Sequence, residues 1–165
     1  MKKIFLISAL LVGVIVAQAQ VKLGHLNSNE LLALMPESIS MQEDLQTYAK
    51  GLESQLTAMQ AEYESKVAEY QQNESTYSDI VKEDKIREVE SIQQRILEFQ
   101  KSAQQSLSEK EIELFTPIRD KATNAIQEVA KEAGFTYVFD LGAGSLLYVN
   151  ESQDILPLVK AKLGL

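Results

Sequence analysis

The sequence predicts an α+β protein in which a long antiparallel helical hairpin projects from a small β-containing body. Residues 41–133 have a helical pattern almost throughout, with one glycine, Gly51, and one proline, Pro117. The segments on both sides are rich in β-forming residues. A helical run of this length exceeds ordinary globular helices, which seldom pass about 20 residues, so it is most simply two helices lying side by side. Such a hairpin has too little apolar surface to collapse alone, which indicates a role in binding rather than in chemistry.

The first residues have the pattern of an export signal. Lys2 and Lys3 precede a largely apolar run over residues 4–16, and a small-x-small sequence ends at Ala19. This is typical of a bacterial signal peptide cleaved after Ala19, so we expect the mature chain to be periplasmic and to start at Gln20. The alternative, a membrane anchor, needs about 20 apolar residues, and here polar residues follow the short run at once.

Composition excludes several classes of partner. The chain has no cysteine, so it forms neither disulfides nor a cysteine-linked lipid, and its formal net charge is -8. Nucleic-acid binding needs a basic surface that displaces counterions, and anionic lipid also attracts basic surfaces. We therefore expect no nucleic-acid partner and no stable membrane insertion of the mature chain.

Residues 20–40 are predicted to form the N-terminal part of the body. Residues 21–26 favour a strand. Asn27 or Ser28 is suited to cap a short helix that runs through Leu34, because either side chain can accept a hydrogen bond from a helix-start N–H. Pro36 then ends that helix or opens the next one.

The first helix of the hairpin has a narrow apolar stripe. Its members follow one another at steps of three and four, in a pattern that repeats every eleven residues, which favours a straight or slightly right-handed bundle. The stripe comprises Leu45, Tyr48, Leu52, Leu56, Met59, Tyr63, Val67 and Tyr70.

The stripe stops between Asn73 and Asp84, where turn-forming residues gather, so we place the tip of the hairpin there. A second helix follows, and its apolar face begins Ile86, Val89, Ile92, Ile96 and Phe99. Pro117 lies inside this helix and is expected to kink it where the arm meets the body. Gly134 is suited to end it in the left-handed conformation.

The last thirty residues return to a β pattern. Residues 135–141 and 145–149 read as a β-hairpin around Gly142-Ala143-Gly144. Asp154 is then suited to cap a closing helix that has Pro157 in its first turn. The predicted organisation is a signal peptide over 1–19, body over 20–40, helical arm over 41–116 and body again over 117–165. A core this small is marginal alone, so we expect self-association.

Catalytic patterns are close to absent, and we predict no catalytic, cofactor or metal residues. The single histidine, His25, has no second histidine or cysteine with which to form a metal or nucleophile site, and is read as an ordinary strand residue. The glycine pair at 142 and 144 lies between strands, whereas a nucleotide loop joins a strand to a helix. A hydrolase is therefore the weakest reading.

The mature sequence resembles the Skp/OmpH family of periplasmic chaperones, which hold unfolded outer-membrane proteins. The resemblance covers nearly the whole mature chain, including the first strand, the Asn27-Ser28 turn and the Met35-Pro36 step. It is most specific towards the C-terminus, in Pro117-Ile118, residues 125–140, Leu147-Tyr148, Asp154-Ile155 and Val159.

The resemblance implies a homotrimer whose strands form a small central barrel, with three helical hairpins around a cavity and no use of ATP. Unfolded outer-membrane proteins are the partners it implies. Stripe residues suited to contact such clients are Leu52, Leu56, Met59, Tyr63, Val67 and Tyr70, and local physics makes Gly51 and Pro117 candidate hinges. The alternative for the stripe is that it packs the two helices of the hairpin together.

The charge of the predicted arm differs from that of the family. Its better known members have basic arms, whereas residues 43–110 here carry fourteen acidic and eight basic residues. Binding of acidic clients or of lipopolysaccharide is therefore not carried over. The competing function is a structural or adaptor protein of the cell envelope that binds one folded partner through its hairpin.

Overall fold

The computed structural model describes residues 21–144 and 146–165, so the predicted signal peptide and the predicted cleavage after Ala19 lie outside the described part. In chain order its helices and strands are β1 (Leu23–Leu26), α2 (Ser28–Leu34), α3 (Pro36–Asn73), α4 (Asp79–Glu132), β2 (Tyr137–Asp140) and α5 (Leu156–Leu163). Short 3-10 turns lie at Glu74–Thr76, Leu141–Ala143 and Glu151–Gln153.

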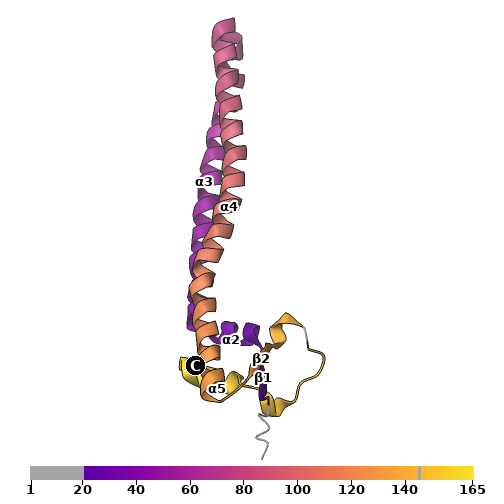
Figure 1. Cartoon of the computed structure of the whole chain (residues 1–165). Helices are drawn as coiled ribbons and strands as arrows, with labels where there is room; N and C mark the ends of the chain where they lie inside the picture. Colours follow the sequence, from indigo (N-terminus) through magenta and orange to yellow (C-terminus); the bar gives the residue numbers. More distant parts are fainter. Residues whose placement is uncertain (1–20, 145) are drawn as a thin grey trace, which may run out of the picture.

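Two long helices dominate the molecule. Figure 1 shows α3 and α4 side by side as one rod that projects from a small body containing β1, β2, α2 and α5. The tip is the 3-10 turn at Glu74–Thr76, within the region where the sequence placed it. The helical hairpin and the small sheet are thus confirmed. We keep the name arm for residues 41–116.

The predicted start of the body is confirmed in detail. Of the two candidate caps, Asn27 is the one used, and its side-chain oxygen accepts hydrogen bonds from the N–H groups of Asn29 and Glu30 at 3.1 and 3.3 Å. Met35 separates α2 from α3, and Pro36 occupies the first turn of α3, where its missing N–H costs no helical bond.

The predicted β-hairpin over 135–141 and 145–149 is wrong. β2 pairs with β1 in parallel, with Leu23 opposite Tyr137, and among the described residues 146–149 no strand forms. The Asp140 carboxylate accepts a 2.8 Å hydrogen bond from the N–H of Gly142, which turns the chain into a 3-10 turn, and Gly144 follows with φ +68. The chain therefore leaves the sheet at the place where a returning strand would have to begin.

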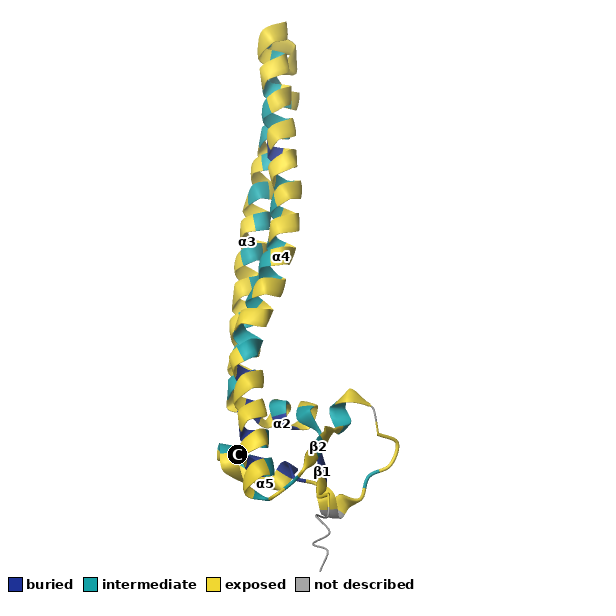
Figure 2. Ribbon diagram, viewed as in Figure 1, coloured by how far each residue is buried: buried dark blue, intermediate teal, exposed yellow. Residues whose placement is uncertain are grey.

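The core lies where the base of α4 meets the body. Leu26, Leu31, Met35, Ile155 and Val159 are almost fully buried, and they pack with Ile118, Ala122, Ala125, Val129 and Leu156. In Figure 2 the dark blue residues gather at this base, while the arm is mostly exposed. Ile92 is the only arm residue classed as buried.

Of the two predicted helix boundaries of the C-terminal part, the end of α4 is confirmed, whereas α5 has Ile155 at its N-cap and Asp154 one residue before it. α4 continues through Pro117 and ends at Glu132, and Gly134 then adopts φ +71. The Asp154 carboxylate accepts a 2.9 Å hydrogen bond from the N–H of Leu156 at the start of α5. None of the described helices has both the length and the apolar character needed to cross a membrane.

Candidate binding surfaces of the arm and body

The six stripe residues proposed from the sequence, Leu52, Leu56, Met59, Tyr63, Val67 and Tyr70, are all half-buried on α3. Near the tip, Val67 and Tyr70 line a groove of about 410 Å³ together with Ile86 and Val89 of α4. Half-burial is what packing of the two helices produces, and it leaves only the edges of these side chains accessible. Their contact with a client stays a prediction.

Tyr70 is the most constrained aromatic residue of this groove. Its ring centroid lies 6.5 Å from that of Tyr77, and its hydroxyl donates a 3.4 Å hydrogen bond to Glu74 Oε1. Partial burial, together with the nearby Glu74 carboxylate, raises the pKa of Tyr70. The phenol is therefore neutral at physiological pH and presents an apolar ring with a polar end.

Ion pairs join the two helices below the tip. Lys66 Nζ lies 2.6 Å from Glu88 Oε1, Lys85 Nζ lies 2.8 Å from Glu69 Oε1, and each lysine also approaches the other's carboxylate. Hydrogen bonds from Lys85 and Lys66 lower the pKa of Glu69 and Glu88 respectively. Because the charges alternate between α3 and α4, this network fixes the register of the two helices.

The candidate hinges Gly51 and Pro117 both lie in continuous helix. Gly51 is exposed in α3, and a Cβ added there would meet nothing within 4 Å. Pro117 lines a groove at the base of the arm beside Pro36 and the ion pair of Glu37 with Lys121. Bending at either position stays a prediction.

Sequence reasoning missed a set of exposed apolar side chains on α4. Ile86, which the sequence placed on the apolar face of the second helix, is 43% exposed, and Leu97 and Ile112 are 55% and 63% exposed. The signal that could have found them is that Ile86 and Leu97 are separated by eleven residues, the repeat used for α3. Ile86 borders the groove between the two helices, whereas Leu97 and Ile112 lie outside it.

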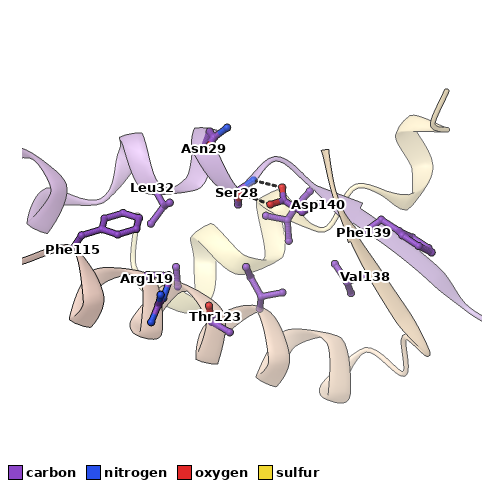
Figure 3. Close-up of a pocket in the computed structure, with 12 residues that line it drawn as sticks. Ser28, Asn29, Leu32, Phe115, Arg119, Thr123, Val138, Phe139 and Asp140 are labelled. Carbon is purple, nitrogen blue, oxygen red and sulfur yellow. Dashed lines mark hydrogen bonds between the residues drawn. The ribbon is translucent and has the colours of Figure 1, made fainter. Parts of the chain in front are cut away.

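A pocket of about 380 Å³ opens in the body between α2, α4 and β2 (Figure 3). Its walls are mainly apolar, including Leu32, Phe115 and Val138, with Arg119 among its lining residues. At one end, Asp140 accepts hydrogen bonds from the N–H and hydroxyl of Ser28 at 3.0 and 2.6 Å. Burial alone would raise the pKa of Asp140, but these bonds and the one from Gly142 outweigh it and lower the pKa.

The body also presents apolar side chains beside an open strand edge. In the described sheet β2 pairs only with β1, and its residues Tyr137 and Phe139 are exposed. Beyond it, Leu147 and Tyr148 are 103% and 86% exposed. The chain around them is anchored at its end, where His25 Nε2 lies 2.8 Å from the Asn150 carbonyl oxygen and thus donates to it. No described group of three or more His, Cys, Asp or Glu residues is placed to hold a metal ion.

Comparisons with known proteins agree with this architecture. A family model described as outer membrane protein (OmpH-like) matches residues 22–163. No curated protein matches the sequence. Among solved structures, a crystal structure from Caulobacter crescentus CB15, described as an OmpH-like outer membrane chaperone, matches with a TM-score of 0.77 and 14% identity. The match covers 88% of this chain and 85% of that one.

Proposed function

This chain belongs to the OmpH-like family, and from that premise we propose that it is an ATP-independent periplasmic holdase. In this role the mature protein, cleaved after Ala19, binds unfolded outer-membrane proteins before they reach the membrane. It holds them in a cavity between helical arms. The family match and the chaperone-like fold support this function over that of an enzyme.

The observation that carries the proposal is the surface of the arm. Within residues 41–116 only Ile92 is buried, so two helices of great length are built with almost no core of their own. A long rod with scattered, partly exposed apolar side chains offers many weak contacts. Many weak contacts along one unfolded chain add up to useful avidity without a single tight site.

A cavity needs more than one copy of the chain, and we place a homotrimer at the centre of the proposal. Two features of the body support assembly: the open edge of β2 and the solvent-exposed Leu147 and Tyr148. An unpaired strand edge is a ready template for pairing with another chain. Strands of three copies would close into a small barrel, from which three arms hang around the client.

The half-buried α3 residues Leu52, Leu56, Met59, Tyr63, Val67 and Tyr70 supply part of the client contact in this proposal. Met59 has a flexible side chain that adapts to irregular partners, and the tyrosines combine an apolar ring with a polar end. Such side chains suit a client that has no fixed shape.

The test is suppression of aggregation in the absence of nucleotide. The purified mature protein is mixed with a urea-denatured outer-membrane β-barrel protein, the urea is diluted, and light scattering is followed. We expect scattering to fall as the molar ratio of trimer to client approaches one. Unchanged scattering at excess protein would refute the holdase function, and recovery of one folded envelope partner without unfolded clients would favour the adaptor.

A further inference from the structure

Three exposed apolar side chains lie along one face of α4. Leu97 follows Ile86 by eleven residues and Ile112 follows Leu97 by fifteen. At 3.6 residues per turn the three lie within about 80° of the helix circumference. Their exposed fractions are 43%, 55% and 63%. We call these three residues the α4 face.

The α4 face lies largely away from α3, and only Ile86 borders the groove that Val67 and Tyr70 line. Ile92, which is 2% exposed, marks the side of α4 that packs against α3. By the same helical geometry Ile92 is rotated about 120° from Ile86 and about 140° from Leu97. Leu97 and Ile112 are therefore not needed for packing of the two helices, so their apolar character needs another explanation.

The charges of the arm that have no ion pair are predominantly negative. The cations of the arm are largely occupied, since Lys66, Lys85, Arg87, Arg95 and Lys110 all form ion pairs with carboxylates. Within residues 43–110, all of them described, three cations and nine carboxylates have no ion pair. The carboxylates are Glu43, Asp44, Glu53, Glu64, Glu74, Asp79, Glu90, Glu98 and Glu109, and the cations are Lys50, Lys82 and Lys101.

Resting on the proposed holdase function, we infer that the α4 face binds unfolded polypeptide segments in which apolar residues are interspersed with lysine or arginine. Apolar side chains of the client cover Ile86, Leu97 and Ile112, and its cations meet unpaired carboxylates such as Glu90 and Glu98. The protein thus prefers unfolded proteins of net positive charge. Complementary charge of this kind speeds encounter and excludes partners of the wrong sign.

The negative charge of the arm also argues against other possible partners for this face. A second arm of the same chain would bring an equal excess of carboxylates against this one, and like charges placed together are unfavourable. Nucleic acid and anionic lipid are excluded by the same sign. An extended basic polypeptide would cover the apolar side chains with its own apolar residues and would pair its cations with the carboxylates.

The experiment compares one unfolded protein in two charge states. The first probe is fluorescently labelled lysozyme that has been reduced and alkylated, so that it is permanently unfolded and basic. The second probe is the same preparation after its lysines have been succinylated, which gives it a negative charge. Binding to the full mature protein is measured by anisotropy at low and high salt. We expect the basic form to bind at least about tenfold more tightly, with a difference that shrinks as salt screens the charges.

Variants assign the effect to the α4 face. The triple variant Ile86→Gln, Leu97→Gln and Ile112→Gln should weaken binding of both forms by about tenfold. A matched triple at other exposed positions, Leu34→Gln, Ile39→Gln and Tyr48→Gln, should weaken it far less. The charge variant Glu90→Gln with Glu98→Gln should weaken only the basic form and flatten its salt dependence, whereas Glu30→Gln with Glu151→Gln in the body should not.

Circular dichroism and light scattering are used to check whether each variant retains its helicity and mass. Equal binding of the two probe forms, or equal effects of the two triples, would overturn the inference while leaving the holdase function intact. A change in mass caused by the α4 triple would show that the face is an interface between copies and would also overturn it. Binding of neither probe form would refute the holdase function itself.

Discussion

Lys66 of α3 and Glu88 of α4 form an ion pair that links the two helices of the arm, with 2.6 Å between Nζ and Oε1. Lys85 and Glu69 form the reciprocal pair, in which the cation comes from α4 and the carboxylate from α3. Sliding one helix along the other would break both pairs at once. The network therefore specifies a register that the narrow apolar seam specifies only weakly.

This network predicts a pH dependence confined to the extremes. The hydrogen bond from Lys66 lowers the pKa of Glu88 in the folded arm, so its stabilising contribution is fully present above the ordinary pKa of a glutamate and is lost as pH falls through the lowered value. The hydrogen bond from Glu88 raises the pKa of Lys66, so the contribution is lost again only in strong alkali. We expect hydrogen exchange of backbone amides near the tip to accelerate, beyond its intrinsic pH dependence, at the acid end.

Lys66→Met should reduce that acid sensitivity, leaving the part due to Lys85 and Glu69, and should lower the thermal midpoint slightly at neutral pH. Lys50→Met is the matched control, because Lys50 is an exposed lysine on α3 without an ion pair in the described structure. High salt should reduce the difference between the two variants, since these charges are accessible to solvent. Equal exchange rates in both variants across the pH range would show that the network does not hold the tip.

The body core offers a second prediction, at Leu31. Its side chain is fully buried at 0% exposure, whereas Leu34 in the same helix is 44% exposed. Leu31→Ala should lower the free energy of unfolding by about 2–5 kcal/mol, because it removes buried methyl groups and leaves a cavity. Leu34→Ala should change it by less than about 1 kcal/mol in the isolated chain. Chemical denaturation followed by circular dichroism measures both, and similar losses would contradict the assigned core.

The helical arm could be predicted from sequence because its evidence is local. Eleven-residue spacing in α3 and the single interruption after Asn73 are properties of neighbouring residues, and the structure places the tip at Glu74–Thr76 as they indicate. The caps at Asn27 and Asp154 were readable for the same reason, since each side chain bonds to an N–H within three residues.

The sheet was predicted incorrectly because its pairing is long-range. β-rich runs at 135–141 and 145–149 look like a hairpin when only their own residues are considered. In the structure Tyr137 instead pairs with Leu23 in a parallel arrangement, although the whole arm lies between these two residues in the chain. Likewise, the exposure of Ile86 depends on where α3 packs, which residue spacing within α4 alone does not determine. Both errors concern contacts between segments that lie far apart in the chain.

Self-association provides a third prediction, at Leu147 and Tyr148. Their side chains are 103% and 86% exposed in the loop that follows β2 and its 3-10 turn, where assembly would cover them. Leu147→Ser with Tyr148→Ser should lower the mass measured by light scattering from trimer towards monomer, and should reduce the holdase activity with it. Ile80→Ser, which alters an 80% exposed apolar residue near the tip, is the control expected to leave the mass unchanged. A double variant that stays trimeric would remove these residues from the interface.

Gly51 provides a fourth prediction, which concerns the stability of α3 and its proposed bending. It lies in the middle of α3, and a Cβ there would meet no atom within 4 Å, so Gly51→Ala should fit without strain. Because alanine gives up less backbone entropy in a helix, the variant should stabilise the arm by about 0.5–1 kcal/mol, measured by denaturation. Gly24→Ala is the opposite case, since its Cβ would lie 2.9 Å from the Phe135 ring, and we expect it to destabilise the body.

If Gly51 acts as a hinge through which the arm adapts to clients of different size, Gly51→Ala should raise stability while reducing protection of large clients more than small ones. Equal protection of both sizes by the stabilised variant would show that bending at Gly51 plays no part in holding a client.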